Sequence, residues 1–227
     1  MNPPPVLLVH GFATSYQRTW LEAGWVDLLN DAGRTCIPYD LPGHGEREKS
    51  HDPADYADLE GDLAEVVVQH QRLDAVGFSL GARTLLGVAS DYPQRFGRIV
   101  VGGVGANLFR PEDGEALARV VEGNLATEDA MALAFARFAQ GPGSDPLALA
   151  AVLRRPQEPM TAQRLGRVTI PVLVVLGDQD FAGPSDELVN ALPDARLVTL
   201  KGVDHFRTAD HFGFIDASLN FLEAGAG

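Results

Sequence analysis

The chain has 227 residues, of which 45% are hydrophobic and 22% charged, which are the length and composition of one ordinary globular domain. Its formal net charge of −13 argues against nucleic acid or an anionic membrane surface as a partner. Cys36 is the sole cysteine, no apolar stretch reaches transmembrane length, and nothing resembles a signal peptide, so we expect one cytoplasmic domain over residues 1–227.

Short apolar, β-branched runs alternate along the chain with segments of helical periodicity. This alternation is typical of a parallel sheet with helices on both faces. The expected strands cover residues 6–9, 35–39, 73–78, 99–104, 172–176 and 196–200. The sequence therefore predicts an α/β fold whose small sheet has about six, mainly parallel strands.

Three helices are expected around these strands. Asp52 can cap one whose first turn contains Pro53 and whose apolar residues recur through Tyr56, Leu63 and Val67. A second covers residues 80–92 and stops at Pro93, and the last passes through residues 212–222.

Residues 106–166 interrupt the alternation, because they contain helical patterns at 117–121, 131–138 and 147–153 but no strand pattern. An all-helical insertion in an α/β sheet is most simply a lid over the carboxyl ends of the strands. Its apolar side chains either roof a binding pocket or pack the lid onto the core, and we favour packing. Phe135 and Phe138 are retained as substrate-binding candidates, together with Trp20 on the helix expected after the first strand.

Residues 77–81 have the sequence Gly-Phe-Ser-Leu-Gly and join the expected strand 73–78 to the helix that follows. Gly-x-Ser-x-Gly at such a junction is a nucleophile elbow, in which a strained backbone exposes the serine hydroxyl above the sheet. Gly77 and Gly81 lack the side chains that would collide there. Ser79 is the expected nucleophile.

A serine hydroxyl needs a base and an orienting acid, which follow such an elbow in the order acid, then histidine. Asp180, just beyond the strand at 172–176, is the preferred acid, while Asp178 more simply fixes the turn. His205 follows the last strand and is preferred to His211, which begins the final helix. The remaining histidines precede Ser79, which is the wrong order: His10, His44, His51 and His70.

Two backbone amides are the expected oxyanion-hole donors. Leu80 directly follows the nucleophile, and Phe12 lies in the segment after the first strand, where Gly11 lets the backbone approach the substrate. His10 is expected to hold this loop through side-chain hydrogen bonds.

Together these motifs resemble the α/β-hydrolase superfamily. The matching segments are Val-His-Gly-Phe at 9–12, Asp-Leu-Pro-Gly-His-Gly at 40–45, the elbow, Gly-x-x-Asp at 177–180 and Asp-His at 204–205. The resemblance covers the chain outside the lid and implies a triad of Ser79, Asp180 and His205. Two features depart from the family: the chain begins too late for two further antiparallel strands, and the loop at 40–45 continues into Glu46 and Arg47 where a serine is usual.

Serine at the elbow, where haloalkane dehalogenases and epoxide hydrolases have aspartate, implies acyl transfer through an acyl-enzyme. We expect a serine hydrolase of the carboxylesterase or thioesterase type, whose partner is a small-molecule ester or thioester with a small or medium acyl group. No metal or organic cofactor is expected, because the sequence has neither a clustered ligand set nor a Gly-x-Gly-x-x-Gly motif after its first strand.

Other functions stay open. Ser-Leu-Gly-x-Arg at 79–83 is similar to the menaquinone-pathway lyase that makes 2-succinyl-6-hydroxy-2,4-cyclohexadiene-1-carboxylate, and this similarity implies that Arg83 holds a substrate carboxylate. The simpler alternative is that Arg83 pairs with an acid on the helix surface. A non-catalytic ligand-binding protein that retains the triad, and a perhydrolase or haloperoxidase-like side activity, are the further alternatives.

Overall fold

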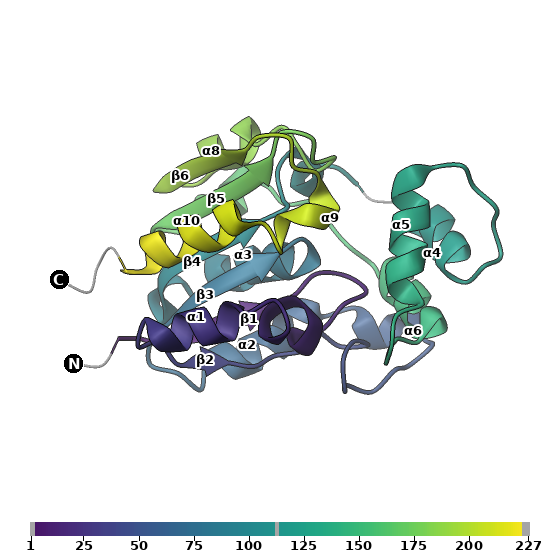
Figure 1. Cartoon of the computed structure of the whole chain (residues 1–227), viewed down its shortest axis with the longest axis horizontal. Helices are drawn as coiled ribbons and strands as arrows, with labels where there is room; N and C mark the ends of the chain where they lie inside the picture. Colours follow the sequence, from purple (N-terminus) through teal and green to yellow (C-terminus); the bar gives the residue numbers. More distant parts are fainter. Residues whose placement is uncertain (1–2, 112–113, 224–227) are drawn as a thin grey trace.

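The computed structural model describes residues 3–111 and 114–223. Its strands form one sheet in the order β2-β1-β3-β4-β5-β6, and every neighbouring pair is parallel (Figure 1). In chain order the strands are β1 (Val6–Val9), β2 (Cys36–Ile37), β3 (Leu73–Phe78), β4 (Phe96–Gly102), β5 (Val172–Gly177) and β6 (Ala195–Leu200). The expected six-stranded α/β sheet is confirmed.

Helices cover both faces of the sheet, so side chains of both orientations along each strand are buried. Leu7 and Val9 of β1 pack in one core cluster, and Val6 and Leu8 pack in the other. The first cluster is completed mainly by α2 (Leu59–Val67), α3 (Leu80–Asp91), α7 (Ala162–Leu165) and α8 (Asp186–Ala191). The second is completed by the π-helix η1 (Gln17–Leu21), α1 (Trp25–Asp31) and α10 (Phe212–Glu223).

Between β4 and β5 the chain forms the 3₁₀-helix η4 (Ala106–Phe109) and then a group of three helices before α7. These are α4 (Glu115–Val121), α5 (Ala130–Ala139) and α6 (Pro146–Arg154), called the helical insertion below. Figure 1 shows them gathered at one end of the sheet, away from both chain termini. Asp129 and Asp145 cap α5 and α6 by accepting hydrogen bonds from backbone N–H groups of their first turns.

Several expected elements differ from those observed, among them the strand expected at 99–104, which is observed as β4 at Phe96–Gly102. The strand expected at 35–39 is reduced to β2, two residues long. The helix expected from Asp52 onwards is divided into the 3₁₀-helix η2 (Pro53–Tyr56) and α2, because Asp58 accepts a hydrogen bond from the Gly61 N–H and starts a new helix. The helix expected after the first strand, which carries Trp20, is observed as η1 and α1, separated at Gly24, whose φ of 82° is left-handed.

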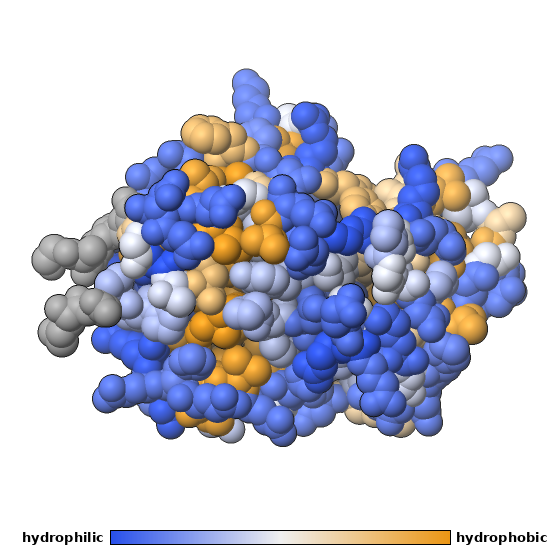
Figure 2. All heavy atoms as spheres, turned by 60° about the horizontal axis from the view of Figure 1, so that its bottom comes forward, coloured by the Kyte–Doolittle hydropathy of each residue, from blue (hydrophilic) through white to orange (hydrophobic). Residues whose placement is uncertain are grey.

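The remaining short elements are η3 (Pro93–Arg95) and α9 (His205–Thr208). Within the described residues, no helix is both long enough and apolar enough to cross a membrane. Figure 2 shows a face on which polar and charged residues predominate and apolar residues form patches between them.

Candidate active site

Ser79 lies at a sharp turn between β3 and α3. Its φ of 53° and ψ of −116° are unusual for a residue with a side chain. The turn brings the following helix so close to β3 that a Cβ atom at Gly77 would lie 2.8 Å from the Ala82 Cα, and one at Gly81 would collide with the His10 carbonyl oxygen. The two glycines of the motif therefore permit the backbone geometry that exposes the serine.

A hydrogen-bonded series of side chains starts at this serine. Ser79 Oγ lies 2.9 Å from His205 Nε2. On the other side of the ring, His205 Nδ1 lies 2.9 and 3.0 Å from the two carboxylate oxygens of Asp180. Asp180 follows β5 and His205 opens α9, and both side chains are buried. Residues 126 positions apart in the sequence thus meet at one edge of the sheet.

The competing acid and histidine have other partners. Asp178 Oδ1 accepts a hydrogen bond of 2.7 Å from the Gly202 N–H and so joins the turns after β5 and β6. His211 Nδ1 accepts a hydrogen bond of 3.0 Å from the Gly213 N–H at the start of α10. Each stabilises a turn, whereas Asp180 and His205 face each other.

Phe12 and Leu80, the expected oxyanion-hole residues, both line the cavity that contains Ser79. Neither backbone N–H donates a hydrogen bond to another described residue. After Phe12 the chain turns sharply, because Ala13 adopts a φ of 58°. A Cβ atom at Gly11 would lie 3.3 Å from the Ser79 Cβ, so this loop closely approaches the elbow.

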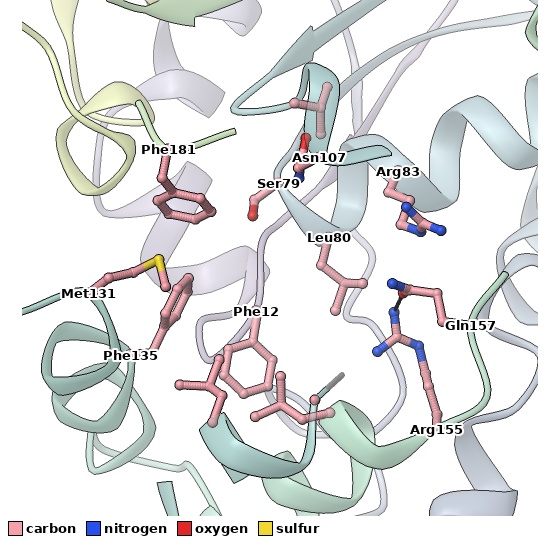
Figure 3. Close-up of a pocket in the computed structure, with 14 residues that line it drawn as sticks. Phe12, Ser79, Leu80, Arg83, Asn107, Met131, Phe135, Arg155, Gln157 and Phe181 are labelled. Carbon is pink, nitrogen blue, oxygen red and sulfur yellow. Dashed lines mark hydrogen bonds between the residues drawn. The ribbon is translucent and has the colours of Figure 1, made fainter. Parts of the chain in front are cut away.

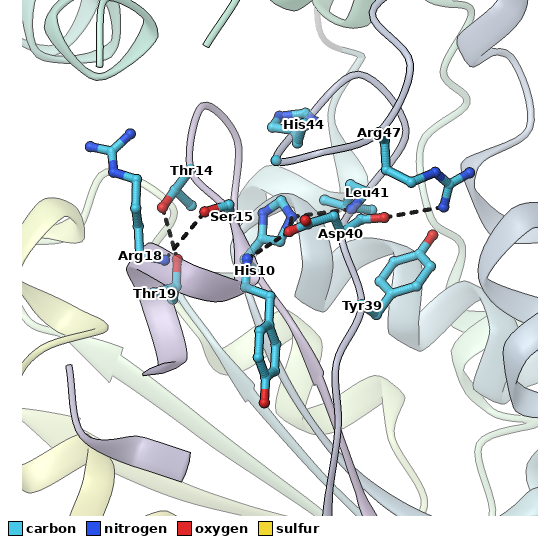
Figure 4. Close-up of polar contacts among 12 residues, drawn as sticks. His10, Thr14, Ser15, Arg18, Thr19, Tyr39, Asp40, Leu41, His44 and Arg47 are labelled. Atoms are coloured by element: carbon cyan, nitrogen blue, oxygen red, sulfur yellow. Dashed lines mark hydrogen bonds and ion pairs between the residues drawn. The ribbon is translucent and has the colours of Figure 1, made fainter. Parts of the chain in front are cut away.

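Polar contacts behind this loop hold its position (Figure 4). His10 Nε2 lies 3.1 Å from the Leu41 amide nitrogen and 3.3 Å from Asp40 Oδ1. Asp40 also accepts a hydrogen bond of 2.7 Å from the Tyr16 N–H. Burial alone would raise the pKa of Asp40, but the contact with His10 and the hydrogen bond from the Tyr16 N–H outweigh it and lower this pKa to about 2. The segment at 40–45 therefore supports the Phe12 loop.

A cavity of about 350 Å³ extends from Ser79 beneath the helical insertion. This volume is at the lower end of the range of small-molecule sites. Figure 3 shows Phe135 and Phe181 on one side of Ser79, and Arg83, Arg155 and Gln157 on the other. The remaining lining residues are mainly apolar: Phe12, Leu80, Val104, Asn107, Gly114, Leu117, Met131 and Leu153. We call this space the large cavity.

A second cavity of about 200 Å³ also reaches Ser79, and we call it the small cavity. It lies between the Phe12 loop, η1 and the start of α9. Its lining residues include most of the aromatic side chains near His205 and several polar ones: Gly11, Phe12, Thr14, Arg18, Thr19, Glu22, Phe78, Ser79, Phe135, Phe138, His205, Phe206, Ala209 and Asp210.

Arg83 is buried, whereas one expectation placed it on the helix surface; the other, that it holds a substrate carboxylate, stays a prediction. Its side chain is buried and lines the large cavity, so it is not a helix-surface residue. The guanidinium donates to the Leu108 carbonyl oxygen at 3.4 Å and to the Glu158 carbonyl oxygen. Leu108 precedes the helical insertion and Glu158 follows it, so Arg83 binds both segments that connect the insertion to the sheet.

The aromatic candidates are distributed differently from the prediction. Phe135 lines both cavities, and Phe138 lines the small cavity, where it stacks on Phe206. Trp20 is a correction: it is fully buried, lies 5.0 Å from Trp25 between ring centroids, and lines neither cavity of the described residues. Its large apolar ring packs beneath the sheet in the core cluster of α1 and α10.

Sequence reasoning missed several residues of the large cavity. The Phe181 ring centroid lies 4.3 Å from that of His205, and Phe181 is nevertheless 44% exposed. Its position directly after the expected acid is the one signal that could have identified it. Asn107 and Gln157 have no comparable signal, because they come from the segments that connect the helical insertion to the sheet.

Comparisons with known proteins identify a family for this chain. A family model described as the alpha/beta hydrolase family matches residues 6–217. The 2-hydroxy-6-oxo-6-phenylhexa-2,4-dienoate hydrolase of Burkholderia cepacia is 30% identical to this chain over 179 residues, which are 66% of this chain and 62% of that protein. The match thus spans less than two thirds of the relative's length.

Solved structures share the fold. A bromoperoxidase from Bacillus anthracis has a TM-score of 0.73 at 24% identity, covering 98% of this chain and 92% of that one. A thermophilic esterase from Thermogutta terrifontis has a TM-score of 0.74 at 21% identity, covering 98% of this chain and 90% of that one. At these identities the likeness shows the fold alone. Because the family model covers nearly the whole sequence, this chain belongs to the alpha/beta hydrolase family.

Proposed function

We propose that this protein is a serine hydrolase that cleaves a small-molecule carboxylic ester or thioester through an acyl-enzyme. The observation that carries the proposal is the hydrogen-bonded series from Ser79 Oγ through His205 to Asp180, with 2.9 Å between Oγ and Nε2. A serine is a weak nucleophile without such a base, and a buried carboxylate on the far ring nitrogen fixes the tautomer that leaves Nε2 free to accept a proton.

The proposed reaction has two halves. Ser79 Oγ attacks the substrate carbonyl carbon while His205 Nε2 takes its proton, and the amides of Phe12 and Leu80 stabilise the oxyanion. The bond to the leaving oxygen or sulfur then breaks, and His205 returns the proton to that atom. Water attacks the acyl-enzyme by the same route and releases the acid.

The large cavity is the proposed site of the acyl group. Its mainly apolar lining and its volume of about 350 Å³ suit a small or medium chain. Phe135 and Met131 of α5 contribute to this lining, which supports a role for the helical insertion as a lid. Tight closure by such a lid would exclude water from the carbonyl carbon.

A second candidate function is hydrolysis of a carbon–carbon bond. The substrate in the name of the Burkholderia cepacia relative has a ketone and a carboxylate but no ester, so its hydrolysis must break a carbon–carbon bond. Arg83 and Arg155, with Gln157, form a polar end of the large cavity that would suit such an anion. The same polar end would suit the substrate of the lyase alternative.

A series of p-nitrophenyl esters with increasing acyl length tests the main proposal. We expect turnover with an optimum at small or medium length, and a loss on the order of 10⁴-fold or more in kcat for Ser79→Ala. Ser144→Ala, at a serine that lines neither cavity, is the matched control. Retention of most activity by Ser79→Ala would contradict the proposal. Turnover of 2-hydroxy-6-oxo-6-phenylhexa-2,4-dienoate without ester hydrolysis would favour the second candidate.

A further inference from the structure

Ser79 lies where the two cavities meet. Ser79, Phe12 and Phe135 line both of them. His205, however, lines the small cavity and is not among the described residues that line the large one. Ser79 therefore faces both cavities, whereas His205 faces the small cavity.

This asymmetry assigns the two parts of the substrate, if the acyl transfer proposed above is correct. When the ester bond breaks, His205 Nε2 must deliver its proton to the leaving oxygen, which has to lie within hydrogen-bond reach of that nitrogen. The leaving group therefore belongs on the His205 side, in the small cavity. The acyl group then occupies the large cavity.

The lining of the small cavity is rich in hydrogen-bonding groups. Thr14 and Thr19 contribute hydroxyls joined by a hydrogen bond of 2.9 Å, and Figure 4 shows Arg18 on the same side of this loop. Glu22 and Asp210 contribute carboxylates. These five residues come from the Phe12 loop, from η1 and its end, and from the segment between α9 and α10.

The charged groups of this lining do not neutralise one another. In the described part of the chain no ion pair joins Arg18 to Glu22 or Asp210, although Glu22 accepts a hydrogen bond from Gln17. Arg18 Nη1 is buried and has no hydrogen-bond partner among the residues described. Such a buried donor costs free energy unless something pairs with it.

We propose that the small cavity is a leaving-group subsite for a polar alcohol that carries further hydroxyl or amino groups. Its hydroxyl or amino hydrogens would bind Glu22 and Asp210, and its oxygens would accept from Arg18, Thr14 and Thr19. The lining contains two carboxylates and one guanidinium, so an anionic leaving group is disfavoured. A volume of about 200 Å³, at roughly 30 Å³ for each water-sized group, suits an alcohol of about six heavy atoms, such as glycerol.

Acyl transfer to added alcohols tests the subsite directly, because the second half-reaction can run with an alcohol in place of water. The alcohol oxygen bonds to the acyl carbon while its proton passes to His205. The bond between the acyl carbon and Ser79 Oγ then breaks, and His205 returns the proton to Oγ, so a new ester forms and the free serine is restored. The acyl-enzyme would be generated from a p-nitrophenyl ester, and glycerol, 2-aminoethanol or 1-propanol would compete with water at equal concentration. The O-acyl product ratio is the measurement, at a pH below that of spontaneous aminolysis.

We expect glycerol and 2-aminoethanol to capture the acyl group about tenfold more often than 1-propanol, the discrimination that one additional hydrogen bond supplies. In Arg18→Met and Asp210→Asn this preference should fall towards unity. The two substitutions change different parts of the lining, and Asp210 is exposed, so its variant is compatible with a folded protein. Arg119→Met, at an exposed arginine of α4 that lines neither cavity, is the matched control.

The two proposals fail in different ways. Turnover of the p-nitrophenyl ester with equal capture by all three alcohols, or an unchanged preference in both variants, would overturn the polar subsite and leave the serine hydrolase standing. No Ser79-dependent turnover of any ester would overturn the hydrolase proposal and the subsite with it.

Discussion

At Ser79, hydrogen bonds to neighbouring elements hold a backbone conformation that residues with a side chain rarely adopt. A non-glycine residue with positive φ costs on the order of 1–3 kcal/mol. The Ser79 N–H donates to the Gly102 carbonyl oxygen at 2.8 Å, and the Ser79 carbonyl accepts from the Arg83 N–H at 3.0 Å. Hydrogen bonds to β4 and to the first turn of α3 therefore fix both sides of this residue.

His44 is a second residue whose surroundings decide its chemistry. The side chain is 2% exposed, its Nδ1–H donates to the Pro42 carbonyl oxygen at 2.9 Å, and its Nε2 has no partner among the described residues. Burial, and then the nearby His10, lower the pKa of His44 to about 3. In the folded protein this ring is therefore neutral at physiological pH.

Folding stability should depend on this histidine below neutral pH. The unfolded chain binds the proton with a pKa of about 6.5, so the stability contributed by neutral His44 is complete above that pH and is lost as pH falls towards 3. For one proton, the free energy of unfolding changes by at most about 1.4 kcal/mol per pH unit. We expect His44→Asn to reduce the pH dependence of the free energy of unfolding between pH 6.5 and 5, as measured by urea titration at several pH values.

The slope, and not the absolute stability, is the informative quantity, because removal of a buried ring will itself destabilise the protein. His70→Asn changes a histidine that is only partly buried and serves as the control. A slope in His44→Asn equal to that of the wild type would show that His44 does not cause the dependence.

Among the elements, the helical insertion packs on the rest of the molecule through α6, whose Ala151 and Val152 share a core cluster with Tyr56 and Leu59. Its own small core consists of Val121, Ala139 and Leu149 packed on Ala13 of the Phe12 loop. Arg154 of α6 forms ion pairs with Glu115 of α4 and with Glu122 directly after it, which join two helices of the insertion to each other. The connection to the sheet is made where the Met160 N–H donates to the Leu108 carbonyl oxygen at 2.8 Å, beside the Arg83 guanidinium.

Arg83→Met should therefore loosen the helical insertion while the sheet stays intact. We expect amide hydrogen exchange to accelerate several-fold in α4, α5 and α6, with little change in β3 and β4. The reason is that the buried guanidinium binds carbonyl groups on both connecting segments. Unchanged exchange in these helices, with a raised KM only for substrates that carry a carboxylate, would instead indicate that Arg83 binds substrate.

At the scale of the whole molecule, the sheet order decides where the site lies. From β1 the chain crosses to β2 on one side, and then returns to β3 on the other. The loops after β1 and β3 therefore diverge at the carboxyl edge of the sheet and leave a crevice between them, which is where ligands bind in open α/β sheets. Phe12 follows β1 and Ser79 follows β3, so both face this crevice.

The net charge of −13 also acts at this scale. Electrostatic repulsion between this negatively charged protein and a polyanion should prevent their association, because binding to DNA or anionic lipid depends on cationic side chains. We expect no co-sedimentation with vesicles that contain 30% phosphatidylserine, and no retardation of duplex DNA, at physiological salt. Binding that weakens as salt is added would contradict this prediction and indicate a local basic surface.

Local motifs in the sequence were sufficient for the fold class and for the order of the candidate site residues. Apolar runs of strand length, helical periodicity and Gly-x-Ser-x-Gly each depend on neighbours within a few residues, and the expected β1 and β3 have the observed bounds. Asp180 and His205 were identifiable because each directly follows a strand, and parallel strands end at one edge. The start of α2 was not identifiable from the sequence, because a second capping residue, Asp58, sets that helix boundary.

Only the tertiary structure decided which side chains share a cavity. Trp20 and Arg18 are two residues apart in η1, yet Trp20 is buried beneath the sheet and Arg18 lines the small cavity with Asp210. Arg83 was placed on the correct helix by its sequence, but its partners Leu108 and Glu158 are 25 and 75 residues away. Which way a side chain faces, and what it meets, depends on how distant segments pack together, and local sequence patterns do not encode that packing.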